Sequence, residues 1–207
     1  PLLDLGAFKV KVFSLGEVLI MLAYMASLYL SLLAPLYLEG AQGYTPYQAG
    51  LMLVLPILCY AGLCFVSGKI LGKRGIWPLT PVGLGIVVAG YCFMALAGHL
   101  EILPFFLICV AISYGGIGIV YPAIKSVDLE ALPRKISSNG SAIHSTLVQI
   151  AGSVSSALFV GMMSGQVDHL MASGTAKAAA YGAAFDLTAL IAIGLLIGAF
   201  IISFVYT

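Results

Sequence analysis

Six long apolar runs, with short polar breaks between them, are the feature of this sequence that most restricts its fold. A helix needs about 20 apolar residues to cross the hydrocarbon of a bilayer, and each run is close to that length or longer. None of the runs alternates apolar and polar residues, and an open sheet edge cannot face lipid. We therefore predict an all-α membrane protein with six transmembrane helices, at about residues 13–38, 46–71, 78–98, 102–124, 141–163 and 181–205.

The composition places these helices in a bilayer rather than in the core of a soluble domain. Hydrophobic residues make up 61% of the 207 residues, charged residues only 8%, and the mean hydropathy is +1.10. A soluble domain carries roughly 25% charged residues, so this chain has too few to cover a water-facing surface. The lipid bilayer is therefore its first partner, and the net charge of +1 gives no reason to expect a nucleic acid.

The few charges are distributed unequally between the two sides of the predicted spans. Cytoplasmic loops of membrane proteins carry an excess of Lys and Arg, so the side rich in them is predicted to be cytoplasmic. With six spans, both termini of this piece then lie in the cytoplasm, and the expected location is the plasma membrane. Eight of the nine Lys and Arg residues share that side, namely Lys9, Lys11, Lys69, Lys73, Arg74, Lys125, Arg134 and Lys135, whereas Lys177 falls on the other side with Glu39, Glu101, Asp168 and Asp186.

The break "LYLEGAQGYTPYQAG", residues 36–50, has the composition of a tight turn outside the membrane. Gly40 and Gly43 are expected to end one helix. Thr45 is placed to cap the next helix, Pro46 suits its first position, and Gln48 completes a T-x-x-Q capping box. The chain is thus predicted to reverse direction here, where water can satisfy its backbone.

No cofactor or metal site is predicted. The segment "GIGIV" lacks the Lys and Ser or Thr of a phosphate-binding loop. No His and Glu pattern has the spacing of metal ligands. The cysteines fall inside apolar runs without such spacing and are expected to pack as small apolar side chains, at Cys59, Cys64, Cys92 and Cys109.

The sequence begins with Pro1, and "PLLDLGAFKVKV" lacks the apolar region and cleavage site of a signal peptide. We therefore expect the chain to be a piece of a longer protein.

Three motifs resemble a known family. They are "APLYLEGAQGYTPYQAGLMLVLP", "SGKILGKRGIWPL" and the late segment that runs from "GGIGIVYPAIK" to "STLVQIAGSVSSALF". Together they resemble the second half of a drug:proton antiporter of the major facilitator superfamily, in the branch with fourteen transmembrane helices. The second motif is similar to the cytoplasmic loop motif of that superfamily through Gly68, Lys73, Arg74 and Gly75. It departs from the family at Gly72, where an Asp is preferred, and the late segment departs at Val148, where an Arg is common.

The resemblance implies a half bundle made of two inverted three-helix repeats. Its first and fourth helices would line a central cavity, the second and fifth would face the other half, and the third and sixth would face lipid. The N-terminal half of the transporter, a small-molecule substrate and protons would be the partners. Transport would proceed by alternating access, with protons moving inward as drugs or other lipophilic compounds move out. Such a protein is not an enzyme.

Glu17 is the candidate for proton coupling. It is expected about one turn into the first span, and it is the one acid predicted to lie inside the spans rather than at an outer end or in a loop. A low-dielectric site favours the protonated carboxyl, which suits reversible proton binding. The alternative is that Glu17 lies at the headgroup boundary and stays ionised, near Lys11.

Aromatic and polar side chains within the spans are the candidates for the substrate cavity. Aromatic walls attract lipophilic cations through their apolar area and their π faces. Ordinary packing is the alternative for each tyrosine. A hydrogen bond to another helix is the alternative for His144 and the favoured one for Gln149. The cavity candidates are Tyr24, Tyr29, Tyr114, Gln149 and His144, whereas Tyr37, Tyr44, Tyr47 and Tyr121 are expected in the interfacial aromatic belts.

Two other functions are consistent with the sequence. A self-contained six-span protein could serve as a membrane scaffold or assembly subunit that transports nothing. Alternatively, a half-size transporter could act as a homodimer.

Overall fold

A computed structural model describes residues 5–100, 102–133 and 137–206. A short 3-10 helix, η1 (Leu5–Lys9), precedes the first long helix. Apart from the π-helical η2, the elements that follow are α-helices, and the described residues include no strand. In chain order they are α1 (Lys11–Gly40), α2 (Pro46–Arg74), α3 (Leu79–Leu100), α4 (Leu103–Glu130), α5 (Ser137–Ser155), η2 (Ser156–Val160), α6 (Gly161–Ala172) and α7 (Lys177–Tyr206).

The predicted fold class and number of spans are confirmed. Six helices are long and apolar enough to cross a membrane, and α5, η2 and α6 together form the fifth. Several helices continue past the apolar runs that predicted them: α4 ends at Glu130 rather than near residue 124, and α6 ends at Ala172 rather than near residue 163. An apolar run ends where polar residues begin, but helical hydrogen bonds do not depend on hydropathy and continue beyond that point.

The predicted turn between the first two spans has the expected cap. The Gln48 amide donates to Thr45 Oγ1 at 3.3 Å, and the Thr45 amide donates to Gln48 Oε1 at 3.0 Å. Pro46 is the first residue of α2, and Gly43 has a positive φ of 74°. The capping box therefore fixes where α2 begins.

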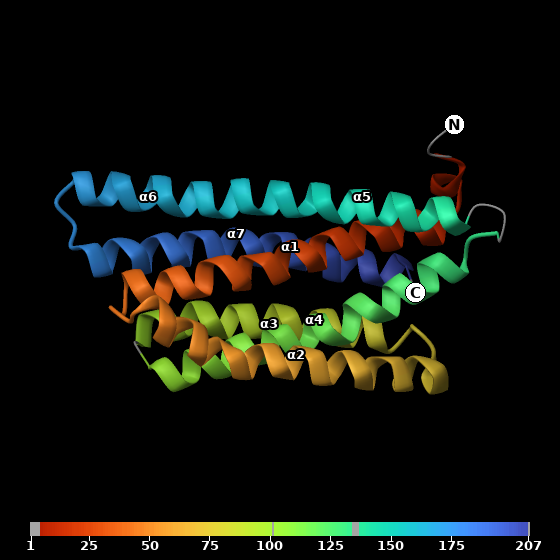
Figure 1. The fold of residues 1–207 in the computed structure, drawn as a ribbon, viewed down its shortest axis with the longest axis horizontal. Coiled ribbons are helices and arrows are strands. Elements are labelled where there is room, and N and C mark those ends of the chain that lie inside the picture. Colours follow the sequence, from red (N-terminus) through yellow and green to blue (C-terminus); the bar gives the residue numbers. More distant parts are fainter. Residues whose placement is uncertain (1–4, 101, 134–136, 207) are drawn as a thin grey trace.

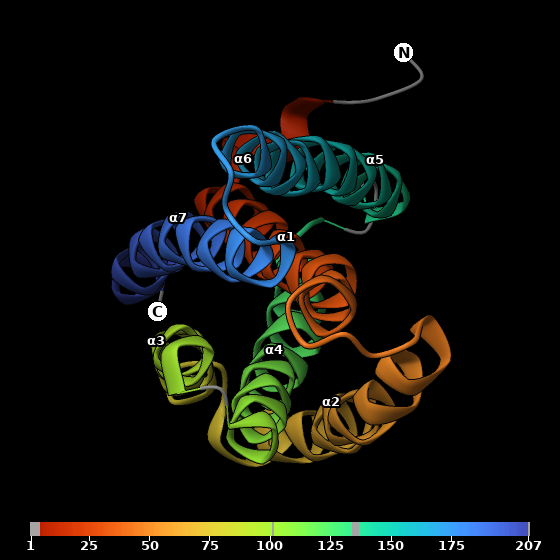
Figure 2. The ribbon, with the colours of Figure 1, turned by 90° about the vertical axis from the view of Figure 1, so that its left-hand side faces the viewer.

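Figure 1 shows the helices running lengthwise, with the two chain ends at the same end of the bundle. The end-on view in Figure 2 shows α1 and α4 in the middle, α3 and α7 on one side and α2 and α5 on the other. The first and fourth spans are therefore central, and the third and sixth share the side opposite the second and fifth.

The central helix α4 packs very closely against α2 and α3, because glycines replace side chains at its contacts. A Cβ on Gly116 would lie 2.8 Å from the carbonyl oxygen of Gly83 on α3, and a Cβ on Gly118 would lie 2.7 Å from that of Tyr60 on α2. Ser67 Oγ also donates to the Ile119 carbonyl at 2.6 Å. Small residues at helix contacts in membranes let backbones approach and pack without a hydrophobic driving force.

Aromatic side chains fill another part of the core. Tyr29 packs edge-to-face on Phe159, with ring centroids 5.0 Å apart, and also contacts Tyr91 and Phe185. The Tyr91 hydroxyl donates to the Ala26 carbonyl at 2.6 Å. This cluster joins α1, α3, η2 and α7 in one packed unit.

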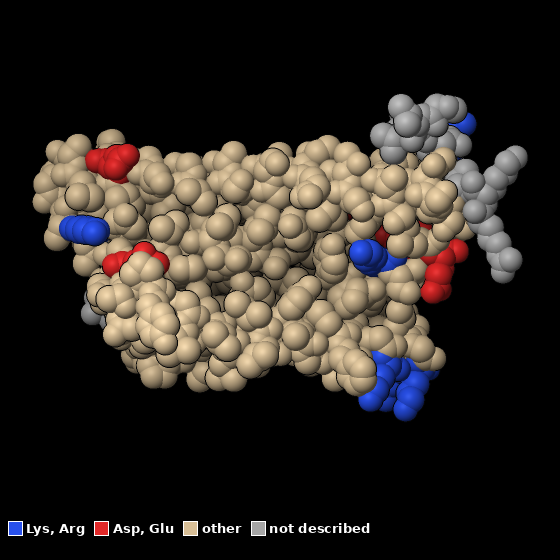
Figure 3. Space-filling model, in the orientation of Figure 1, with Lys and Arg blue, Asp and Glu red and all other residues tan. Residues whose placement is uncertain are grey.

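The charged residues gather at the two ends of the bundle (Figure 3). Among the described residues, most Lys and Arg lie at the end where α1 starts and α2 and α4 finish, whereas Lys177 starts α7 at the opposite end. Arg134 and Lys135 lie outside the described residues. The face drawn in Figure 3 is almost free of charge between these ends, as a membrane-spanning bundle requires.

Gly116→Ala should destabilise the protein because the added methyl group would meet the α3 backbone. Overpacking of this kind costs about 1–3 kcal/mol. Gly62→Ala on α2 is the matched control, since no atom lies within 4 Å of the position that its added Cβ would occupy. Thermal unfolding in detergent should show a lower midpoint for Gly116→Ala and an unchanged or higher midpoint for Gly62→Ala. Equal midpoints for both variants would contradict the close contact.

Candidate functional site

A pocket of about 340 Å³ lies between α1, α2 and α4. The three helices contribute four tyrosines, two serines and three aliphatic side chains to its wall, and no charged side chain. The lining residues are Tyr24, Ser27, Leu28, Ser31, Ile57, Tyr60, Tyr114, Ile117 and Tyr121.

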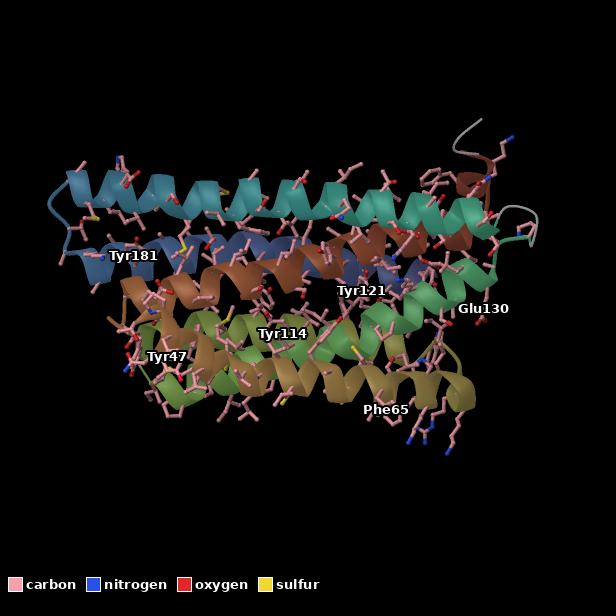
Figure 4. The ribbon with its side chains drawn as sticks, in the orientation of Figure 1. Tyr47, Phe65, Tyr114, Tyr121, Glu130 and Tyr181 are labelled. Carbon is pink, nitrogen blue, oxygen red and sulfur yellow. The ribbon has the colours of Figure 1, made fainter. Side chains whose placement is uncertain are left out.

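The tyrosines form two pairs within this pocket. The ring centroids of Tyr24 and Tyr121 are 6.3 Å apart, and those of Tyr60 and Tyr114 are 6.2 Å apart. Figure 4 shows Tyr114 near the middle of the bundle and Tyr121 farther toward the end that holds both termini. Such a wall offers apolar area, aromatic faces and hydroxyl groups, and therefore suits a lipophilic ligand that also carries a hydrogen-bonding or cationic group.

Two of the predicted cavity residues, Tyr24 and Tyr114, line this pocket. Tyr121 lines it as well, although its position near the end of an apolar run predicts the interfacial belt. The difference arises because α4 continues beyond that run to Glu130, so Tyr121 lies well inside the helix.

Tyr29 does not line the pocket, and the prediction that it does is wrong. Its side chain is fully buried on the opposite side of α1, where its hydroxyl lies 3.3 Å from both the Phe185 carbonyl and Thr188 Oγ1. Its role in the fold is to join α1 to α7.

Glu17 and His144 form a buried pair between α1 and α5. His144 Nδ1 lies 3.0 Å from Glu17 Oε1 and 3.1 Å from Oε2, and the two residues are 3% and 1% exposed, respectively. Glu17 therefore faces into the bundle. His144 does not line the pocket, although its ring lies near that of the pocket residue Tyr121, with centroids 6.3 Å apart.

A second buried carboxyl belongs to Asp128 on α4, a residue that the sequence analysis does not identify as a candidate. It is 0% exposed, and the Tyr206 hydroxyl of α7 donates to its Oδ1 at 2.7 Å. The prediction that Glu17 is the one acid inside the spans is therefore wrong. A helical stripe could have revealed it, because Ile117, Tyr121, Ile124 and Asp128 recur at spacings of four, three and four.

These groups form one continuous set toward the end of the bundle where both chain ends lie. Tyr121 connects the pocket to His144, His144 pairs with Glu17, and the residue before Glu17, Gly16, lies directly against the Asp128 carboxylate. We call Glu17, Asp128, His144 and Tyr206 the inner polar cluster. It contains two carboxyl groups and one group that can carry positive charge, so its protonation decides its net charge.

Gln149 is exposed on the surface of α5, and no hydrogen bond from its side chain is found among the described residues. The favoured alternative, a hydrogen bond across to another helix, is thus not seen within this bundle. The loop-motif residues lie at the end of α2. Gly75 ends that helix with a φ of 74° and donates its amide to the Leu71 carbonyl, while Lys73 and Arg74 are exposed.

The exposed faces of the helices differ in composition. On α5 and α6 the exposed positions include Ser145, Gln149, Ser153 and Gly161 together with Ile150, Val154 and Met171, whereas on α7 they include Leu190, Ile197, Ile201 and Phe204. Only 22% of the most apolar stretch of the fifth span is buried, and only 17% of that of α2. The surface of the fifth span therefore mixes small, polar and apolar side chains, while that of α7 is mostly aliphatic and aromatic.

Comparison with known proteins places these features in a family. The profile described as Major Facilitator Superfamily matches residues 2–156. The chain is 29% identical over 203 residues to the "Uncharacterized MFS-type transporter YcnB" of Bacillus subtilis (strain 168), and the match covers 93% of this chain and 41% of that protein. It is 29% identical over 171 residues to the lincomycin resistance protein LmrB of the same organism, with coverages of 82% and 36%.

A third relative is the lincomycin resistance protein LmrB of Listeria monocytogenes serovar 1/2a, 28% identical over 164 residues, with coverages of 79% and 35%. The chain thus spans well under half the length of the relatives it matches. With the family profile matching most of the chain and six helices fit to span a bilayer, this protein is a multi-pass membrane protein that belongs to the major facilitator superfamily of transporters.

Proposed function

We propose that this chain forms one half of a secondary active transporter that exports drugs or other lipophilic compounds in exchange for protons. The observation that carries this proposal is the continuity between a tyrosine-lined pocket and a buried Glu–His pair, with Tyr121 in contact with both. Substrate and proton sites that share a side chain can influence each other directly. Two relatives named for lincomycin resistance support an efflux role.

The other half of the transporter would correspond to the part of the relatives that this chain does not match. The exposed small and polar positions of α5 and α6, together with the poorly buried α2, offer the surface for it. Helices α2 and α5 lie on the same side of the bundle (Figure 2). Alternating access would then consist of rocking between the two halves about the pocket.

The proton site of this proposal is Glu17 with His144. An ionised carboxyl at depth is unfavourable by at least about 2.5 kcal/mol on insertion scales, so a buried Glu needs either a proton or a cationic partner. His144 can act as that partner when it is protonated. The pair can therefore exchange protons while remaining close to neutral, which suits a carrier that turns over repeatedly.

We expect both termini of this piece to lie in the cytoplasm of a cell whose plasma membrane holds the protein, because Lys and Arg gather at that end of the bundle. Tyr47→Cys and Gly72→Cys test this at the two ends of α2, in a background without other cysteines. An impermeant thiol reagent added to intact cells should label Tyr47→Cys and leave Gly72→Cys unlabelled until the membrane is opened. The reverse pattern would refute the orientation.

Tyr24→Leu should weaken binding of lipophilic cations by the full-length protein. Loss of one cation–π contact, worth about 0.5–2 kcal/mol, corresponds to about a 2- to 30-fold higher Kd. Tyr47→Leu is the matched control, since Tyr47 is 79% exposed at the far end of α2. Ligand binding to purified protein measures both variants, and an unchanged Kd for Tyr24→Leu would exclude this pocket as the cation site.

Glu17→Gln should abolish or shift the pH dependence of efflux while leaving folding intact, because Gln imitates the protonated carboxyl and can still hydrogen-bond to His144. Transport into vesicles at several imposed pH gradients measures the effect. Glu130→Gln, an exposed acid on α4, serves as the control. If Glu17→Gln retained the pH profile of the unaltered protein, proton coupling would have to reside in another group.

A further inference from the structure

Asp128 is fully buried, but its hydrogen bonds satisfy only one of its two carboxylate oxygens. Tyr206 donates to one carboxylate oxygen, Oδ1, at 2.7 Å. The other oxygen, Oδ2, is buried and has no hydrogen-bond partner among the described residues. Buried polar atoms are almost always paired, so an orphan carboxylate oxygen calls for a ligand or a proton.

The charged and titratable groups around Asp128 do not compensate a negative charge. Glu17 and Gly16 approach from α1, His144 from α5, Tyr206 from α7, and Tyr121 shares α4 with it. His144 is already engaged by Glu17, and no Lys or Arg among the described residues forms an ion pair with either acid. A second buried anion beside Glu17 would therefore be both desolvated and repelled.

The backbone is shaped to hold this carboxyl in place. A Cβ on residue 16 would overlap both oxygens of Asp128, so only glycine leaves room for it against α1. The contact sets the Asp128 carboxyl beside the residue that precedes Glu17. The two acids are therefore neighbours in space, although they lie on different helices and far apart in the sequence.

We propose that Asp128 is a second proton-binding carboxyl, held between Tyr206 and Gly16, whose protonation is linked to that of the Glu17–His144 pair. The ligand is the proton, which resides on Oδ2, the oxygen without a protein partner among the described residues. Two protons shared among Glu17, Asp128 and His144 make the inner polar cluster neutral. Loss of one leaves a net buried negative charge, and gain of a third leaves a net positive charge.

This inference rests on the proposed function only for its consequence, which is that a proton could leave the cluster when the inner ends of the helices separate. Proton binding itself requires no transport. The test therefore measures protonation directly, in the full-length protein in lipid, with no substrate and no gradient. Failure of efflux assays would not affect it.

Infrared difference spectroscopy detects the C=O stretching band of a protonated carboxylic acid. At neutral pH we expect such a band in the unaltered protein, its disappearance in Asp128→Asn, and its retention in Glu130→Gln, which removes an exposed carboxyl two residues away on the same helix. Protein grown with isotope-labelled aspartate should shift the band and so assign it to Asp rather than Glu. A band that persists unchanged in Asp128→Asn would overturn the proposal.

Two further variants test the linkage and guard against misfolding of Asp128→Asn. Tyr206→Phe keeps the carboxyl but removes the hydrogen bond to Oδ1, so the band should shift to higher frequency. Glu17→Gln removes the neighbouring negative charge, so the pH at which the band is half lost should move to lower pH. A band unaffected by Tyr206→Phe would refute the placement of the proton, and an unmoved midpoint in Glu17→Gln would refute the linkage.

Discussion

The close contact of α4 with α2 and α3 is the constraint on which the rest of this structure depends. Gly116 and Gly118 bring α4 within backbone distance of its neighbours, where no side chain would fit. Because α4 lies so deep, it can present Tyr114 and Tyr121 to the pocket and Asp128 to the inner polar cluster. Without this packing, the residues that give the site its chemistry would lie farther from α1, and the pocket would have no third wall.

The inner polar cluster is an unfavourable arrangement for a membrane protein to maintain. Four polar side chains from α1, α4, α5 and α7 are buried at the end of the bundle where apolar residues would pack with less desolvation. Buried ionisable groups in membrane helices usually have a function that offsets this cost. Here the four helices are also tied together by these groups, so a change in protonation acts on helix contacts as well as on charge.

The sequence predicted the helices and part of the site. Hydropathy located six spans, and the capping box at Thr45 was correct to the residue. Hydropathy could not locate helix ends that lie among polar residues, and for this reason Asp128 falls outside the predicted span 102–124 although α4 includes it. Periodicity also could not tell which face of α1 borders the pocket. Tyr24 and Tyr29 are both aromatic residues in the middle of the span, but Tyr24 lines the pocket and Tyr29 is buried in the core. Tertiary packing, which the sequence pattern does not show, makes this difference.

The π-helical segment η2 has a consequence for the fifth span. Along that span, buried residues recur at every fourth position, at Ala151, Ser155, Phe159, Met163 and Val167. A plain α-helix has 3.6 residues per turn, so such a stripe would wind steadily around its axis. The wider turn of η2 takes up the excess and returns the stripe to one side, in contact with α1 before it and α7 after it. The fifth span therefore consists of two α-helical segments joined by a π-helical turn that contains an inserted residue. Deleting one residue of η2 would leave the helix continuous but would rotate α6 away from α7.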